Sequence, residues 1–166
     1  QGGGILIGHL VGMKKINAAY TIGKRIMRLG TTTSVTLALL TAIFGKHILG
    51  MLTSDPWIIS TGAAILWIEV LLENGRALNF FGVNSLRSAG DIYFPVIIGI
   101  IVMWGVQVVG SYILGISLGW GLIAMWAIFA LDENVRGLIF LRRWNSFKWV
   151  GKSFVGSKQH VAPKHL

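Results

Sequence analysis

The sequence predicts an all-α membrane protein, a polytopic bundle of spanning helices. Mean hydropathy is +0.68, 54% of the residues are apolar and only 13% are charged, whereas a soluble domain carries about 25% charged residues. Several apolar runs also approach the ~20 residues that a helix needs to cross a bilayer. The lipid bilayer is therefore the first expected partner.

Composition and motifs also argue against other classes. The net charge of +9 comes from basic residues at segment ends, which favours membrane orientation over nucleic-acid binding. The chain has no cysteine, so disulfides and thiolate metal sites are excluded. It shows no metal-ligand cluster, nucleophile–base pair or phosphate loop, so we expect neither an enzyme nor a cofactor.

The first residues are interpreted as the end of a helix. The chain begins with Gln1 inside an apolar run, so residues 1–12 are predicted to be the last turns of a transmembrane helix. The chain would then be the C-terminal part of a longer protein, and the missing N-terminal portion its partner. Residues 13–30 contain five basic residues and no acid, which predicts a basic amphipathic connector at a membrane surface.

Four complete spans are expected after the connector. They cover residues 31–52, 56–86, 92–115 and 120–141. The first begins with hydroxyl residues, which can bond back to the helix backbone. The second begins with Asp55 and Pro56, a typical N-cap and first helical residue.

Residues 142–166 are predicted to form a basic cytoplasmic tail. Its aromatic residues favour an interfacial anchor running to Phe154, followed by a loose polar segment from Gly156. Residues 13–30, Arg87 and this tail together hold 12 of the 15 Lys and Arg residues. The positive-inside rule therefore predicts a multi-pass protein of the plasma or inner membrane with a cytoplasmic C-terminus.

The second complete span carries a polar stripe. An α-helix turns about 100° per residue, which places six residues of this region within an arc of roughly 80°. They are Glu69, Glu73, Arg76, Asn84, Arg87 and Asp91. Asn79 lies in the same helix. Such a stripe faces a protein interior or a water-filled path, not lipid.

The last span also contains charges near its middle: Asp132, Glu133 and Arg136. Each unpaired charge in a bilayer costs about 2.5–3.5 kcal/mol, so six would cost roughly 15–20 kcal/mol, more than a typical fold's stability. Spacing predicts the pairs Glu73–Arg76 and Asp132–Arg136. Glu69 and Glu133 are left over, which gives a net charge of −2.

The surplus acid separates two interpretations. Ion pairs could simply clamp two helices together. Alternatively, a carboxylate in low dielectric can exchange a proton or hold a cation, which would couple ions to transport. In the third span, α-helical spacing puts Trp104, Gln107 and Ser111 on one face. They are candidate substrate-path residues, although a buried interhelical hydrogen bond is the default role of Gln107.

Several motifs together resemble the multidrug and toxic compound extrusion (MATE) family, most closely a bacterial subgroup. They are Gln1–Gly4 with Gly8 and Gly12, Glu73–Asn79 (ENGRALN), Ser85–Asp91 (SLRSAGD), Phe94–Pro95, Asp132–Gly137 (DENVRG), Arg143–Trp144 and Lys148–Trp149. The resemblance implies twelve helices in two six-helix lobes, of which this chain would hold the end of helix 8 and helices 9 to 12 in the C-terminal lobe. It also implies export of cationic small molecules in exchange for Na⁺ or H⁺ by alternating access.

One departure from the family pattern affects the site. Some members carry an acid where Arg76 aligns, so their cation site does not transfer to this residue. The candidates are instead Glu73, which would be the position for Na⁺, and Glu69, together with the acids of the last span.

Two other functions stay open at this point. A flippase for lipid-linked oligosaccharides is built on the same helix plan and would use Arg76 and Arg136 against a pyrophosphate, although the net charge of −2 is unfavourable for it. A non-transporting membrane scaffold would use the charges only to lock helices together.

Overall fold

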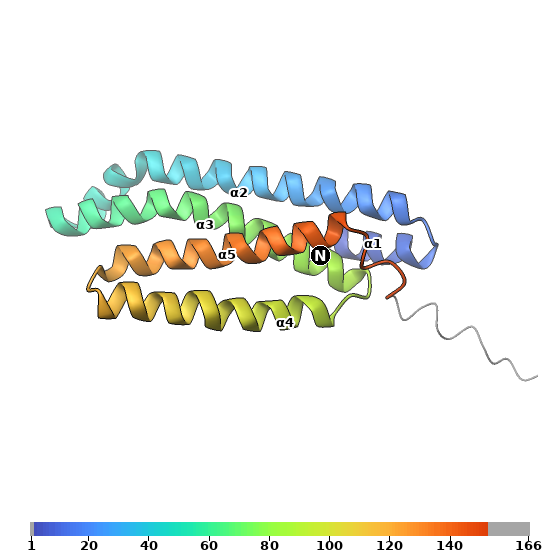
Figure 1. Cartoon of the computed structure of the whole chain (residues 1–166). Coiled ribbons are helices and arrows are strands. Elements are labelled where there is room, and N and C mark those ends of the chain that lie inside the picture. The colour runs from blue at the N-terminus through green and yellow to red at the C-terminus, as the bar shows by residue number, and fades with distance from the viewer. Residues whose placement is uncertain (1, 153–166) are drawn as a thin grey trace, which may run out of the picture.

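The computed structural model describes residues 2–152, and most of them lie in helices that run side by side (Figure 1). The helices are α1 (Gly2–Gly12), α2 (Ile16–Leu52), α3 (Pro56–Ser88), α4 (Tyr93–Val102) and α5 (Gly121–Asn145). No strand occurs in the described range. Three helical segments are long and apolar enough to cross a membrane: Ile16–Leu52, Pro56–Ser88 and Tyr93–Ser117. The predicted all-α membrane bundle is confirmed.

Helix α3 occupies the middle of the bundle. It packs against α2 on one side and α5 on the other, while α4 and its continuation lie mainly against α5 (Figure 1). The short helix α1 packs beside the first turns of α2 and also touches α3. The charged helices α3 and α5 are therefore direct neighbours.

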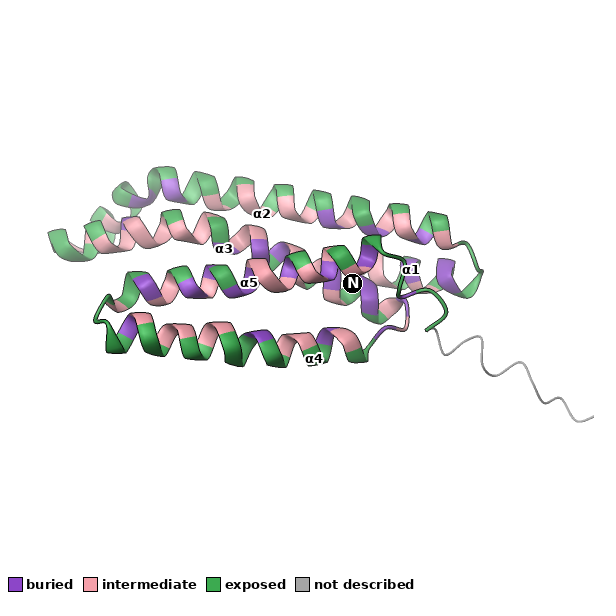
Figure 2. Ribbon diagram, in the orientation of Figure 1, coloured by how far each residue is buried: buried purple, intermediate pink, exposed green. Residues whose placement is uncertain are grey.

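Exposed residues occur along every helix of the bundle (Figure 2). Many of them are large and apolar, as expected where lipid replaces water. Ile43 and Phe44 of α2 are 58% and 56% exposed, and Ile101 of α4 is 60% exposed. Residues of small volume such as Ala63 and Ala77 lie inside. This distribution supports a bilayer environment for the outer faces.

Helix α2 differs from the sequence-based division into a connector (13–30) and a span (31–52). The structure joins both into one helix of 37 residues, and only Met13–Lys15 remain as a connection. The hydroxyls of Thr32 and Thr33 donate to the carbonyls of Arg28 and Leu29 at 2.8 and 2.9 Å, so the polar stretch does not interrupt the helix. A 37-residue helix is about 55 Å long against a hydrocarbon core of ~30 Å, so its first turns reach the membrane surface.

The predicted start of α3 is confirmed. The Asp55 carboxylate accepts from the backbone N–H groups of Trp57 and Ile58 at 2.8 and 3.4 Å, and Pro56 occupies the first helical position. The cap satisfies donors that a helix end leaves free. It fixes where the charged helix enters the bundle.

Helix α4 continues to Ser117 through wide π-helical turns at Met103–Val108 and Ser111–Ser117. The sequence analysis treated this span as regular α-helix. Gly105 and Gly110 lie in or beside the wide turns. Glycines weaken regular helix, and a sequence pattern of apolar residues does not distinguish the two geometries.

The prediction that the aromatic residues after residue 142 lie at the membrane interface is wrong for Trp144 and Trp149. Trp144 and Trp149 are 0% exposed and stack with ring centroids 4.3 Å apart. A side chain on Gly23 of α2 would collide with the Trp144 ring, since its Cβ would lie 2.4 Å from a ring carbon. The glycine thus opens the space that takes these rings into the core. Phe154 and the polar segment from Gly156 lie outside the described residues.

Basic residues gather at one end of the bundle. The α1–α2 connection, the α3–α4 turn and the segment after α5 all lie there (Figure 1). The Asp91 carboxylate joins two of them, because it pairs with Arg143 at 2.8 Å and Lys152 at 3.3 Å. The alternation of helix directions that the orientation argument assumed is therefore present.

Candidate ion and substrate site between the central helices

Glycines bring α3 and α5 almost into backbone contact at the middle of the bundle. A Cβ on Gly75 would lie 2.4 Å from the backbone nitrogen of Asn134, and one on Gly137 would lie 2.9 Å from the Gly75 carbonyl oxygen. Small residues at a crossing let membrane helices approach closely. Charged side chains of both helices therefore flank one short region.

An asparagine network holds this crossing. The Asn134 amide donates to the carbonyls of Leu71 and Ala130, both at 2.8 Å. Its oxygen accepts from Asn74 at 2.9 Å. Since these bonds link α5 to the α3 backbone, they fix how the two helices are placed along each other.

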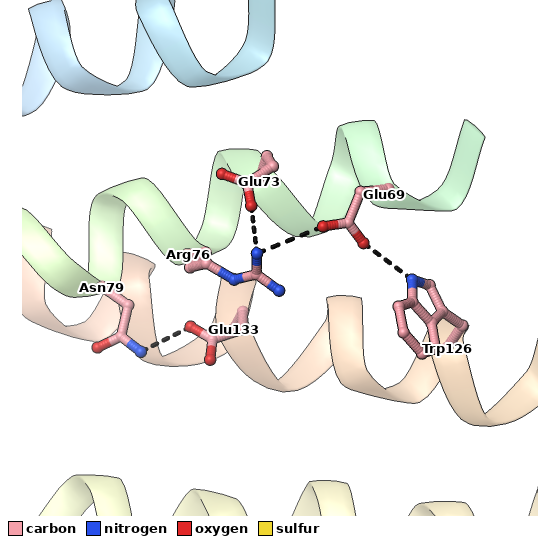
Figure 3. Close-up of polar contacts among 6 residues, drawn as sticks. All are labelled: Glu69, Glu73, Arg76, Asn79, Trp126 and Glu133. Atoms are coloured by element: carbon pink, nitrogen blue, oxygen red, sulfur yellow. Dashed lines mark hydrogen bonds and ion pairs between the residues drawn. The ribbon is translucent and has the colours of Figure 1, made fainter. Parts of the chain in front are cut away.

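The first charged group is the α3 cluster, formed by Glu69, Glu73 and Arg76 (Figure 3). Nη1 of Arg76 lies 3.3 Å from Oε1 of Glu69 and also pairs with Oε1 of Glu73. The other Glu69 oxygen, Oε2, accepts from the indole N–H of Trp126 on α5 at 2.9 Å. The Arg76 side chain is 46% exposed, so residues 2–152 leave it accessible to solvent or to a ligand.

The second charged group is the α5 cluster, formed by Asp132, Glu133 and Arg136. Nη2 of Arg136 lies 3.0 Å from Oε1 of Glu133 and also pairs with Oδ2 of Asp132. The Asp132 side chain is 0% exposed. Asn79 of α3 donates to Oε2 of Glu133 at 2.6 Å (Figure 3), which connects this cluster to α3.

The two predicted ion pairs, Glu73–Arg76 and Asp132–Arg136, are confirmed. Glu69 and Glu133 differ from the expectation, because each contacts the same arginine as its neighbour. A guanidinium offers five donors in a fork and can serve two carboxylates. Each cluster has two acids and one base, so each is net −1 when both carboxylates are ionised.

Each cluster borders a hollow. The α2–α3 pocket, about 310 Å³, is lined by Glu69 and Glu73 and by Ser34 and Thr41 of α2, with apolar neighbours between them. The α3–α5 pocket, about 480 Å³, is lined by Arg76, Asn79 and Glu133 among others. Glu69, Glu73 and Glu133 are therefore not sealed within the described part of the chain, whereas the Asp132 side chain is fully buried there.

Trp104, Gln107 and Ser111 do not share an α-helical face as predicted. Trp104 and Gln107 lie in the first wide turn and Ser111 opens the second, so α-helical spacing does not apply to them. Trp104 is 60% exposed. The buried interhelical hydrogen bond expected of Gln107 is absent from residues 2–152. Their place on a substrate path stays a prediction.

Sequence reasoning missed four polar residues near the clusters: Ser34, Thr41, Trp126 and Asn134. Ser34 and Thr41 are seven apart and so share a helix face, which was the available signal. Asn134 lies in the DENVRG motif, but only the crossing of the two helices shows that it contacts Gly75. Trp126 offered no signal, because an apolar ring with one donor is common near membrane surfaces.

The fold and its intramembrane charges define a polytopic α-helical membrane protein. The MatE family model matches residues 1–113, so the chain belongs to the MatE family. It is 40% identical over 152 residues to the uncharacterized transporter YisQ of Bacillus subtilis (strain 168), covering 92% of this chain and 33% of the relative. It is 28% identical over 113 residues to the probable multidrug resistance protein NorM of Synechococcus sp., covering 65% of this chain and 24% of the relative.

The chain thus spans about a third or less of the length of these relatives. No solved structure gave a significant match to it.

Proposed function

We propose that this chain is part of a secondary active transporter that exports drugs or organic cations in exchange for Na⁺ or H⁺ by alternating access. The observation that carries the proposal is that each of two central arginines is shared by two carboxylates beside a hollow. Membership of the MatE family and similarity to a probable multidrug resistance protein support it.

The shared arginine suggests how a cation would be taken up and released. A cation entering the α2–α3 pocket would compete with Arg76 for Glu73. Arg76 would keep Glu69 as its partner, so no charge is left unpaired in low dielectric. The coupling ion and a cationic substrate would compete for the same carboxylate, and this competition would give exchange.

A bound Na⁺ at Glu73 would need further oxygen ligands. Within residues 2–152, no three His, Cys, Asp or Glu side chains converge as a metal site. Ser34 and Thr41 line the same pocket as Glu73, and hydroxyl oxygens are suitable hard ligands. Proton coupling needs only a carboxylate. No cofactor besides the coupling ion takes part.

For the location, we propose the plasma or inner membrane with the C-terminus in the cytoplasm. The end of the bundle that gathers the basic residues would face the cytoplasm. An N-terminal portion of the same polypeptide would complete the transport path as the second half of an alternating-access pair.

The test is Glu73→Gln in the full-length protein, with export of a fluorescent organic cation measured in cells or vesicles. Export should be lost while the amount of protein in the membrane is retained. Asp55→Asn is the matched control, because it also removes one acid but keeps a good N-cap outside the pocket. Normal export by Glu73→Gln would exclude Glu73 as the exchange site.

A scaffold is the second candidate, favoured by the finding that all four central acids contact an arginine. Glu69→Gln, Glu73→Leu and Arg76→Leu together would remove the α3 cluster without leaving an unpaired charge. A scaffold should keep its membrane level and its partners. A transporter should keep its level and lose cation-driven export.

A further inference from the structure

The α1–α2 connection and the first turns of α2 carry a strongly basic patch with no counter-charge. Residues 13–30 hold five Lys or Arg and no acid. None of the five forms an ion pair with another side chain among residues 2–152, whereas Arg76, Arg136, Arg143 and Lys152 all do. The patch thus contributes five uncompensated positive charges to the basic end of the bundle.

Three of these cations surround a hollow of about 550 Å³ together with Tyr20, Thr21 and Leu29. They are Lys24, Arg25 and Arg28, and all three are exposed. Lys24 lies over the Tyr20 ring, with its Nζ 5.5 Å from the centroid. The opposite face of the helix, with Ala19, Gly23 and Met27, is buried in the bundle. The hollow therefore points away from the helices α3 and α5.

The contacts of Tyr20 indicate where the hollow lies relative to the membrane. The Tyr20 carbonyl accepts from the indole of Trp144 at 3.3 Å, and the Tyr20 hydroxyl donates to Asn145, the last residue of α5, at 3.2 Å. Lys24 to Arg28 covers about 6 Å along the helix, similar to the 5–7 Å that headgroups occupy on each side of a bilayer. The cations thus lie where the spanning helices end.

We propose that Lys24, Arg25 and Arg28 bind the phosphate of an anionic phospholipid headgroup, with Leu29 against its acyl chain. Lys and Arg residues clustered beside the end of a spanning segment attract anionic lipid headgroups. Leu29 is 59% exposed and lies on the membrane side of the cations, since the helix continues into the apolar span. A free phosphate or a nucleic acid would not use this apolar side. The proposal does not depend on transport activity.

The experiment measures lipid binding to the purified full-length protein by native mass spectrometry. Phosphatidylglycerol and phosphatidylcholine are compared for the natural protein and for Lys24→Gln with Arg25→Gln and Arg28→Gln. Each cation near an anionic headgroup strengthens binding about fivefold, so the triple variant should bind phosphatidylglycerol roughly 100-fold more weakly. Phosphatidylcholine binding should not change.

The matched control is Lys14→Gln with Lys15→Gln and Lys46→Gln, which removes the same charge outside the hollow. It should keep the bound phosphatidylglycerol, and so should the charge-conserving variant Lys24→Arg with Arg25→Lys and Arg28→Lys. If the triple variant does not fold, Arg25→Gln alone should still weaken binding about fivefold.

Three results would overturn the proposal. One is an equal loss of phosphatidylglycerol binding in the Lys14, Lys15 and Lys46 control variant, which would show a general effect of charge. Another is unchanged phosphatidylglycerol binding in a folded triple or single variant. The third is displacement of the lipid by inorganic phosphate or an oligonucleotide at similar concentration, which would assign the hollow to a soluble anion.

Discussion

The indole N–H of Trp126 donates to Oε2 of Glu69 at 2.9 Å, across 57 residues of sequence and from α5 to α3. The other oxygen of the same carboxylate lies 3.3 Å from Arg76. Both oxygens of Glu69 thus have donors, one of them neutral and supplied by the neighbouring helix. The indole of Trp126 would therefore compete with an incoming cation for the Glu69 carboxylate.

Replacing Trp126 by Phe should therefore strengthen cation binding at the α3 cluster. The ring would still face Phe129, whose centroid lies 6.3 Å away, but the donor would be lost. A hydrogen bond to a charged group contributes about 1.5–3 kcal/mol, so the coupling-ion concentration for half-maximal export should fall about tenfold or more. Trp67→Phe, at a residue 54% exposed, is the control. A weaker cation dependence would contradict the assignment.

Arg136→Met should destabilise the bundle strongly. It leaves Asp132 and Glu133 without their shared base, and uncompensated buried charge costs about 3–5 kcal/mol. The expected result is a clearly lower thermal unfolding temperature in detergent, with partial recovery on adding Asp132→Asn. Arg142→Met removes an exposed arginine and should have little effect. Equal stability of the two variants would show that Arg136 is not needed for the pairing.

Gly75→Ala should separate the central helices. Its Cβ would lie 2.4 Å from the Asn134 backbone nitrogen, and overpacking at such a contact costs about 1–3 kcal/mol. Gly99→Ala is the matched control, because nothing lies within 4 Å of its Cβ. In a helix that change should add about 0.5–1 kcal/mol of stability. Opposite shifts in unfolding temperature are expected, and a shift in the same direction would argue against the close crossing.

Asp91→Asn should loosen the basic end of the bundle. Asp91 is 2% exposed and pairs with Arg143 and Lys152, and breaking a buried pair by removing one partner costs about 3–5 kcal/mol. Lys152→Ala removes only the outer, half-exposed partner and should cost at most ~1 kcal/mol. Limited proteolysis after residue 145 should be faster in Asp91→Asn alone. Equal protection in all three proteins would exclude this role.

Much of the fold follows from local sequence. Hydropathy predicted the three helical segments that are long and apolar enough to cross a membrane, and Asp55 with Pro56 predicted where α3 begins. The fourth expected span, residues 120–141, is a helix but is not one of those three. The division of α2 failed because hydroxyl residues such as Thr32 can bond within the helix, so polarity there did not mean a break. The burial of Trp144 and Trp149 depends on Gly23, far away in sequence, and basic-aromatic composition alone fits a membrane surface equally well.

The candidate site was predictable only where its contacts are local. Spacing of three or four residues predicted the pairs of Glu73 with Arg76 and of Asp132 with Arg136. Contacts between helices, such as Asn79 with Glu133, depend on how α3 and α5 are aligned. That alignment is set by Gly75, Gly137 and the asparagines at the crossing. These residues lie within the ENGRALN and DENVRG motifs, but the motifs do not show that the two segments meet.

Within residues 2–152, wide turns occur only in the Tyr93–Ser117 segment, and they would allow a local motion that a regular α-helix does not. A π turn can migrate along a helix when one amide after another exchanges its carbonyl partner for the next. Each side chain that it passes would swing by about 100°, while the helix ends near Asp91 and Trp120 stay in place. Migration of the wide turn past Gln107 would rotate this side chain toward the bundle or away from it. The span as a whole would not need to tilt.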